Sequence, residues 1–174
     1  MRRICYSVAM SLDGYVAGPS GEADWIVMDP EMDFMALMAR FDTVLMGRLT
    51  YEAAQKQGHG GAMLGVTSVV VSKTLRLEDH PEVTIIGNNV MGALTKMKAS
   101  KGKDIWLFGG GNLFRSLLGL GLVDSIEVAV IPVLLGGGVQ LLPAGAKRTT
   151  LKLENSKHYK KTGTMSLEYS VKKK

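Results

Sequence analysis

The chain has 174 residues, of which 46% are hydrophobic and 21% charged, and its formal net charge is +5. These values are ordinary for a soluble globular protein, and the length predicts one domain over residues 1–174 with a substantial buried core. The single cysteine, Cys5, excludes an internal disulfide and fits a reducing compartment. The apolar run after the two N-terminal arginines is too short for a signal peptide, and no segment is long enough to span a membrane. We therefore expect a cytoplasmic protein.

Basic residues gather near the C-terminus, where nine lysines and arginines lie within residues 147–174. Such a cluster is one signature of nucleic-acid binding. In "MSLEYSVK", however, the polar residues alternate with Met165, Leu167, Tyr169 and Val171, which share one face of an extended strand. The few aromatic residues are not interleaved with basic ones as a stacking surface requires. The pattern favours a solvated strand face, and we expect no nucleic-acid partner.

The predicted elements begin with a buried strand over residues 4–12, which the turn dipeptide Asp13-Gly14 ends, and an extended stretch follows at 15–17. Residues 29–41 have helical spacing, with Asp29 as the N-cap and Pro30 in the first turn. One side of this helix is apolar and holds Phe34, Met35, Leu37, Met38 and Phe41. Further helices are predicted from residue 48 to about 56, over 90–99 and over 113–120, with a flexible loop at 58–65. Strands are predicted over 43–46, 67–72, 83–86, 105–108 and 125–131, and two alternating strands lie near 150–154 and 164–172.

Strands that alternate with helices predict an α/β fold, in which right-handed crossovers connect a mostly parallel central sheet. The last two alternating strands predict an antiparallel pair at one edge. Ligands of such sheets bind beyond the carboxyl ends of the strands. Four of these ends carry residues suited to a ligand, which are Asp13-Gly14, Gly47-Arg48, Ser72-Lys73 and the glycines Gly109, Gly110 and Gly111.

The stretch "WLFGGGNLFRSL" places three glycines between an apolar strand and a helical pattern. Glycine allows a positive φ angle and lets a ligand approach the bare main chain. A helix that starts there also offers unpartnered N–H groups to an anion. The alternative is a tight connection with nothing bound. Neither phosphate-loop signature is present, because Phe114 stands where G-x-G-x-x-G requires glycine and no Gly-Lys-Ser/Thr follows.

Five motifs in this order resemble the dihydrofolate-reductase-like superfamily: "SVAMSLDGYVAG", "TVLMGRLTYE", "VVVSKTL", "WLFGGGNLF" and "GLVDSIEVAVIPVLLGGGVQLLP". The chain is most similar to the C-terminal reductase domain of riboflavin-biosynthesis enzymes and its stand-alone relatives. This resemblance implies a three-layer αβα sandwich with a mostly parallel sheet and antiparallel C-terminal strands. It also implies that NADPH binds across the strand ends. Homodimers occur among the riboflavin-type relatives, so a homodimer is a further expectation.

The resemblance assigns a cofactor contact to each motif. It places the nicotinamide ring at Ala9 and Val16, and the phosphates and ribose at Gly47, Arg48, Leu49 and Thr50. It places the adenosine 2′-phosphate at Ser72 and Lys73, and the pyrophosphate at Gly109, Gly110, Gly111, Asn112 and Leu113. The chemistry is consistent with these assignments, because arginine and lysine suit a 2′-phosphate and unhindered N–H groups suit a pyrophosphate.

The substrate residues implied by the resemblance are Asp13, which contacts a sugar in the riboflavin branch, and Trp25. Both have a structural alternative, since Asp13 suits a turn and Trp25 suits the core. Arg48 and Lys73 are alternatively solvated surface charges. Tyr51 and Glu52, in the helix after residue 47, are explained equally well by packing and by solvent exposure.

Two departures from the family patterns concern the reaction. Pro30 stands where dihydrofolate reductases have a carboxylate, and Phe108 stands where riboflavin reductases have a glutamate. No residue is therefore assigned as the catalytic acid. The zinc deaminase half is absent, because there is no C-x-x-C, and the scattered His59, His80 and His158 predict no metal site.

The function expected from these features is an NADPH-dependent reductase that transfers hydride to a small pterin-, pyrimidine- or ribose-derived substrate. The main alternative is a non-catalytic NADP(H)-binding protein that has lost a productive substrate site. A basic nucleic-acid-binding module is the remaining alternative.

Overall fold

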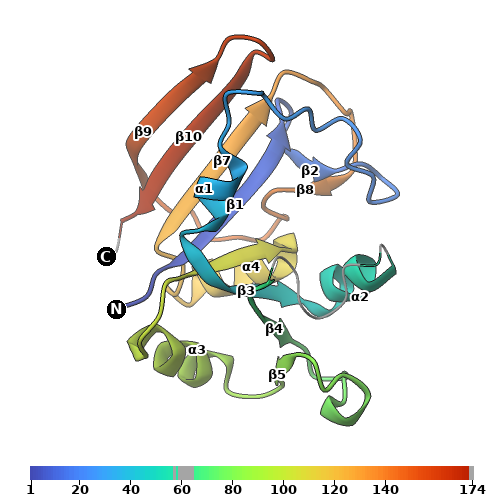
Figure 1. The fold of residues 1–174 in the computed structure, drawn as a ribbon, viewed down its shortest axis with the longest axis vertical. Helices are drawn as coiled ribbons and strands as arrows, with labels where there is room; N and C mark the ends of the chain where they lie inside the picture. Colours follow the sequence, from blue (N-terminus) through green and yellow to red (C-terminus); the bar gives the residue numbers. More distant parts are fainter. Residues whose placement is uncertain (57, 59–64, 173–174) are drawn as a thin grey trace.

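The structure is a computed structural model and describes residues 1–56, 58 and 65–172. His59 and most of the predicted loop at 58–65 lie outside the described residues. The strands are β1 (Ile4–Ser11), β2 (Tyr15–Ala17), β3 (Phe41–Gly47), β4 (Thr67–Val71), β5 (Thr84–Ile86), β6 (Asp104–Gly109), β7 (Ser125–Ile131), β8 (Val139–Gln140), β9 (Leu151–Tyr159) and β10 (Thr164–Val171) (Figure 1). The helices are α1 (Phe34–Met38), α2 (Arg48–Lys56), the short 3₁₀ helix η2 (Leu77–Asp79), α3 (Val90–Ala99) and α4 (Gly111–Gly119).

One eight-stranded sheet has the order β5-β4-β3-β6-β1-β7-β10-β9. All neighbouring pairs from β5 to β7 are parallel, and β10 runs antiparallel to both β7 and β9. The predicted sheet, with an antiparallel C-terminal pair at one edge, is therefore confirmed. β2 and β8 form a separate small sheet. The predicted apolar face of β10 is confirmed for Leu167, Tyr169 and Val171, which pack against the core, but not for Met165, which is 37% exposed.

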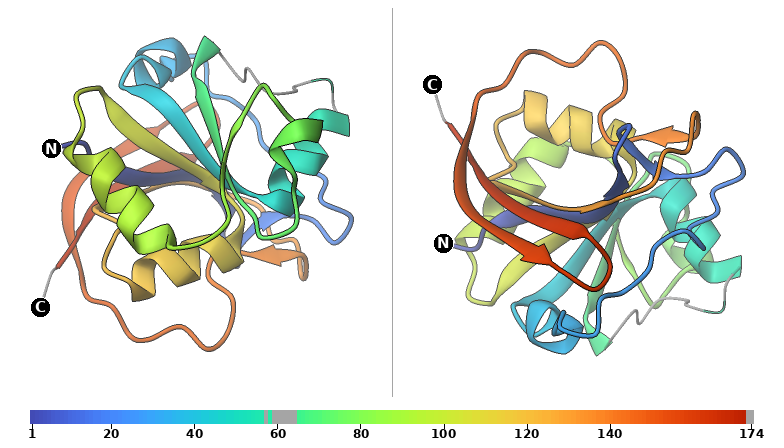
Figure 2. Two further views of the ribbon diagram at one scale, coloured as in Figure 1. Left: turned by 90° about the horizontal axis from the view of Figure 1, so that it is seen from below. Right: turned by 90° about the horizontal axis from the view of Figure 1, so that it is seen from above.

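Helices lie on both faces of the sheet and make three layers (Figure 2). α3 and α4 cover one face, where Leu94 and Leu117 are fully buried and Tyr6 stacks on Phe114 with ring centroids 3.9 Å apart. α1 and α2 lie on the other face, where Tyr51 packs in a cluster with Trp106. The core therefore consists of two apolar layers separated by the sheet.

The helix predicted over residues 29–41 is much shorter in the structure, and its predicted cap is wrong. α1 begins at Phe34, and Asp33 is its N-cap, accepting a hydrogen bond from the amide of Ala36. Asp29 instead accepts from the amide of Glu31 and from Thr162 in the β9–β10 turn. The predicted apolar side of this helix is only partly buried, because Phe34 is 37% exposed and Met35 is 75% exposed. Leu37 and Met38 are half-buried. Phe41 is the first residue of β3 and not part of the helix.

Other elements also differ from the predictions. α4 begins at Gly111, so its first turn includes the last of the three glycines. β9 extends to Tyr159, well beyond its predicted end. The two-residue strand β8 was not predicted, and it pairs with β2 through Tyr15 and Gln140. This pairing brings the segment after β7 towards the carboxyl end of β1.

Candidate functional site

The four strand ends selected from the sequence belong to four neighbouring strands. β4, β3, β6 and β1 are consecutive in the sheet and parallel, so their carboxyl ends lie along one edge. Gly47 is in register with Val71, which puts Arg48 beside Ser72 at adjacent strand ends. Met46 is in register with Gly109, which puts the start of α2 beside the glycine turn, Gly109, Gly110 and Gly111.

Packing within the protein explains only one of the three glycines in the glycine turn. A Cβ on Gly111 would come within 2.9 Å of the Gln140 carbonyl oxygen and of Pro143 Cδ, so packing within the protein requires this glycine. Gly110 has φ −93° and ψ 173°, an extended conformation open to any residue. The peptide bond between Gly109 and Gly110 is cis. Positive φ therefore does not explain Gly110.

The glycine turn lies against the first turn of α2. A Cβ on Gly109 would stand 3.5 Å from the Thr50 side chain, and one on Gly110 would stand 3.3 Å from Thr50 Oγ1. Leu113 Cβ likewise lies 3.9 Å from the position of a Cβ on Gly47. The structure thus brings together Gly47, Thr50 and the glycine turn, which the sequence separates by about sixty residues.

The N-terminus of α4 has no side-chain cap. Gly110 is its N-cap residue, whereas Asn89 caps α3 by accepting a hydrogen bond from the amide of Gly92. The first N–H groups of a helix have no partner within the helix, and the helix dipole adds positive potential there. α2 begins beside α4, so the two helix starts together form a region suited to an anion.

The two basic residues at the neighbouring strand ends are both accessible. Arg48 pairs with Glu52 one turn later at 2.8 Å, and its side chain is 43% exposed. Lys73 is exposed. Ser72 is buried, and its hydroxyl accepts from the amides of Thr74 and Leu75, so it shapes the turn that presents Lys73.

Asp13 forms the predicted turn and also makes a second set of contacts. Gly14 has φ +92°, which favours glycine at this position. The Asp13 carboxylate accepts from Ser11 Oγ at 2.6 Å and from the amides of Leu135 and Gly136, at 2.7 Å for Gly136. The Ser11 hydroxyl and these amides hold the pKa of Asp13 below its ordinary value. Asp13 therefore fastens the loop after β7 to the end of β1.

The remaining predicted positions are dispersed around this edge. Ala9 is half-buried on β1 beside Ala129 of β7, and Val16 lies on β2. Leu49 is 68% exposed and Asn112 is exposed. Trp25 is half-buried, and its indole nitrogen donates to the Glu22 carbonyl oxygen at 3.3 Å within its own loop.

Phe108 packs edge-to-face on Trp106, with ring centroids 4.8 Å apart, so it belongs to the apolar layer under α1 and α2. Asp29, one residue before Pro30, is 2% exposed and bonded to Thr162. Neither position therefore presents a free carboxylate.

Tyr51 is the centre of a polar cluster that sequence reasoning missed. The side chain is 2% exposed, and its hydroxyl donates to Glu82, contacts His80 Nδ1 at 3.0 Å and accepts from Gln55 at 2.7 Å. Burial is the main cause that raises the pKa of Tyr51 to about 12. The cluster joins α2 to the segment before β5. No sequence signal indicates it, because His80 and Glu82 lie about thirty residues after Tyr51.

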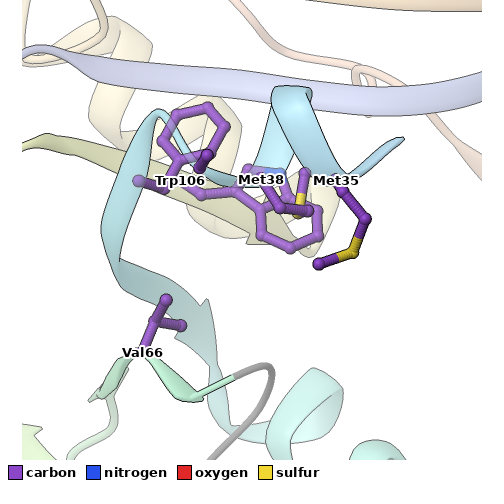
Figure 3. A pocket seen from close by; sticks show the side chains of 6 residues that line it. Met35, Met38, Val66 and Trp106 are labelled. Carbon is purple, nitrogen blue, oxygen red and sulfur yellow. The ribbon is translucent and has the colours of Figure 1, made fainter. Parts of the chain in front are cut away.

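A hollow of about 190 Å³ lies away from these strand ends (Figure 3). It is lined by Met35, Met38, Ala39, Phe41, Val66 and Trp106. Phe41 opens β3 and Val66 precedes β4, so this hollow is at the amino ends of the strands. Among the residues that the structure describes, no three His, Cys, Asp or Glu side chains gather where a metal ion would bind. None of the described helices is long and apolar enough to cross a membrane.

The strand order, the three layers and the matching solved structures define a dihydrofolate-reductase-like α/β fold. Residues 2–165 match the RibD C-terminal domain family, and the chain belongs to that family. It is 32% identical over 178 residues to the uncharacterized protein YyaP of Bacillus subtilis, covering 97% of this chain and 94% of that protein.

Two solved structures illustrate the range of similarity. A crystal structure from Shewanella sp. PV-4, provisionally assigned to riboflavin biosynthesis, has a TM-score of 0.80 and 26% identity, covering 99% of this chain and 100% of that one. A dihydrofolate reductase from Enterococcus faecalis, complexed with NADP(H) and RAB-propyl, has a TM-score of 0.68 and 13% identity. The overlap covers 98% of this chain and 97% of that reductase.

Proposed function

We propose that this protein binds NADP(H) along the carboxyl ends of β4, β3, β6 and β1 and acts as a reductase of a small substrate. One observation carries the proposal: the glycine turn and the uncapped start of α4 lie directly against Thr50 in the first turn of α2. Membership of the RibD C-terminal domain family supports a reductase. The NADP(H) bound to the similarly folded Enterococcus reductase supports the choice of cofactor.

The residues at this edge fit the chemical parts of NADP(H). The amides at the start of α4 suit a pyrophosphate, because they have no partner within the helix, no side chain caps them, and they lie at the positive end of a helix dipole. Gly110 has no side chain between this backbone and a ligand, although its conformation would allow one. Arg48 and Lys73 would hold the 2′-phosphate. Arg48 is available for this contact, because its exposed ion pair with Glu52 contributes little to stability. Ala9 and Val16 would flank the nicotinamide.

The cofactor, when bound, supplies the hydride that the reaction transfers. The chain's own residues would orient the substrate at Asp13 and Trp25, beside Ala9 at the end of β1. Asp13 would act mainly by holding the loop at Leu135 and Gly136 in place, because these amides already occupy its carboxylate. A pterin-, pyrimidine- or ribose-derived substrate is proposed from the family resemblance.

A non-catalytic NADP(H)-binding protein is the second candidate, and a specific observation favours it. Pro30 and Phe108 replace the carboxylates of the two known reductase patterns, and the neighbouring Asp29 is buried against Thr162. No carboxylate at these positions is available to donate a proton. Proton supply from water or from the substrate would be required for turnover.

Isothermal titration with NADPH and NADH tests the binding half of the proposal. We expect saturable NADPH binding with one site per chain, and absence of binding to both dinucleotides would overturn the proposal. Oxidation of NADPH in the presence of dihydropterin, aminopyrimidine ribitol or ribose-derived substrates then distinguishes the candidates. Tight NADPH binding without turnover of any such substrate would favour the non-catalytic protein.

A further inference from the structure

The segment between β8 and β9, residues 141–150, forms a strap around the outside of α4 (Figure 2). It borders a second hollow, of about 330 Å³, which is partly open to solvent and lies on the face of the sheet that α3 and α4 cover. This volume lies at the lower end of the range for small-molecule pockets, about 300–1,000 Å³. The lining residues are Phe114, Leu118, Ile126, Leu141, Leu142, Ala146, Lys147, Arg148, Thr149 and Leu151.

The strap is attached to the rest of the protein near both of its ends. Arg115 Nη1 donates to the Ala144 carbonyl oxygen at 2.6 Å. Pro143 packs so closely on Gly111 that a Cβ there would come within 2.9 Å. At the far end, the amide of Lys172 donates to the Thr150 carbonyl oxygen at 3.1 Å.

The walls of the hollow are apolar and continue the main core. Phe114 and Ile126 are buried members of that core, and Leu118, Leu141 and Leu151 pack partly buried against it. Pockets lined mainly by apolar side chains bind ligands largely through apolar contact. The walls therefore predict an occupant with an apolar body.

The mouth of the hollow carries two adjacent positive charges. Lys147 and Arg148 are exposed, and neither forms an ion pair with any residue that the structure describes. An anion bound between these two cations is attracted by both, and it also reduces their repulsion of each other. Arginine in addition binds a carboxylate through two parallel hydrogen bonds. The mouth therefore complements a single negative head group.

We propose that this hollow is a binding site for a small amphipathic carboxylate. Its apolar tail would lie between α4 and Ile126, and its carboxylate would lie at Lys147 and Arg148. The site is separate from the strand ends of the proposed reductase, and the inference stands without that function. A neutral molecule of the same tail would lose the attraction of the two cations, and a cationic one would be repelled.

Isothermal titration of the full-length protein with octanoate, octan-1-ol and octylamine tests the proposal, because the three share a tail and differ in charge. We expect octanoate to bind most tightly and octylamine most weakly. The double variant Lys147→Ala/Arg148→Ala should weaken octanoate roughly tenfold while leaving octan-1-ol unchanged. Lys160→Ala/Lys161→Ala removes an equal, adjacent pair of exposed charges from the β9–β10 turn and should change neither affinity.

A filled hollow should bind none of the three ligands. Ala146→Phe and Leu142→Trp each enlarge a lining side chain of the strap, at two different positions, so either cooperatively folded variant suffices. The proposal is overturned if octanoate does not bind, if octan-1-ol binds as tightly as octanoate, or if a folded filling variant retains octanoate affinity.

Discussion

Thr50 lies against the backbone of Gly110, so closely that a β-carbon on Gly110 would stand 3.3 Å from Thr50 Oγ1. The two residues come from different helix starts, α2 and α4, and they form one continuous surface at the strand ends. Gly110 is extended, with φ −93°, so a side chain there would not strain the backbone by its φ angle. A substitution of Gly110 therefore tests whether a ligand occupies the space beside Thr50.

Gly110→Val should abolish NADPH-induced thermal stabilisation while the ligand-free protein still unfolds cooperatively. A ligand bound only by the folded state stabilises it by RT ln(1 + [L]/Kd), about 2.7 kcal/mol at one hundred times Kd, and this increment should disappear. Differential scanning fluorimetry with and without NADPH measures it. Gly119→Ala is the matched control, because the same helix has open space at Gly119. A full NADPH shift in Gly110→Val, with a lowered ligand-free Tm, would mean that the glycine serves only the turn.

Arg48→Ala/Lys73→Ala should remove most of a preference for NADPH over NADH. Each charge-assisted contact to the 2′-phosphate contributes roughly 1–3 kcal/mol, and NADH has no such phosphate. Glu52→Gln should act in the opposite direction, because it frees Arg48 from its ion pair. Arg76→Ala is the control, since Arg76 is 77% exposed and pairs only weakly with Glu78 at 3.7 Å. Equal affinity of the unaltered protein for both dinucleotides would exclude this role for Arg48 and Lys73.

Asp13→Asn should impair turnover more than NADPH binding. Asparagine suits the same turn, but it offers one acceptor oxygen where the carboxylate offers two to Ser11, Leu135 and Gly136. Hydrogen exchange at the amides of Leu135 and Gly136 should accelerate several-fold, because this loop loses its attachment to β1. Retained protection of both amides would show that the loop does not depend on Asp13. Loss of NADPH affinity together with folding stability would assign Asp13 to the turn alone.

Much of the fold could be predicted from local sequence patterns. α3 (Val90–Ala99) and β7 (Ser125–Ile131) have the predicted bounds, because a capped helical pattern and a β-branched apolar run determine them locally. The edge that gathers Gly47, Ser72 and the glycine turn was also predictable, since parallel strands end together. The local motifs were sufficient to select these strand ends without the structure.

The sequence patterns fail to predict local structure where residues distant in the sequence determine it. The third glycine of the turn is required by Gln140 and Pro143, which pack on it from beyond β7. Asp13 bonds to a loop 122 residues away. β8 has only two residues, too few for any periodic pattern, and it forms because β2 lies beside it. No window of sequence contains these relationships.

Asp29 is the clearest case, and it leads to a prediction about acid stability. Its carboxylate is 2% exposed and accepts from the amide of Glu31 and from the amide and hydroxyl of Thr162, 133 residues away. These donors, the Glu31 amide first, hold the pKa of Asp29 below its ordinary value. The unfolded chain therefore takes up the proton at a higher pH than the folded one. The stability that Asp29 contributes is full above the ordinary aspartate pKa and is lost as pH falls through the lowered one.

Asp29→Asn should lower the free energy of unfolding at neutral pH and flatten its decline towards acid pH, because the titrating group is gone. Thr162→Val should act in the same direction but less strongly, since the Thr162 amide still donates to Asp29. Urea unfolding across the acid range measures the two curves, with Asp24→Asn as the control at an exposed aspartate in the same loop. If the Asp29→Asn curve ran parallel to that of the unaltered protein, the link between Asp29 and Thr162 would not contribute to acid stability. A curve that converges with it at low pH is the expected result, because a protonated Asp29 and an asparagine have the same charge.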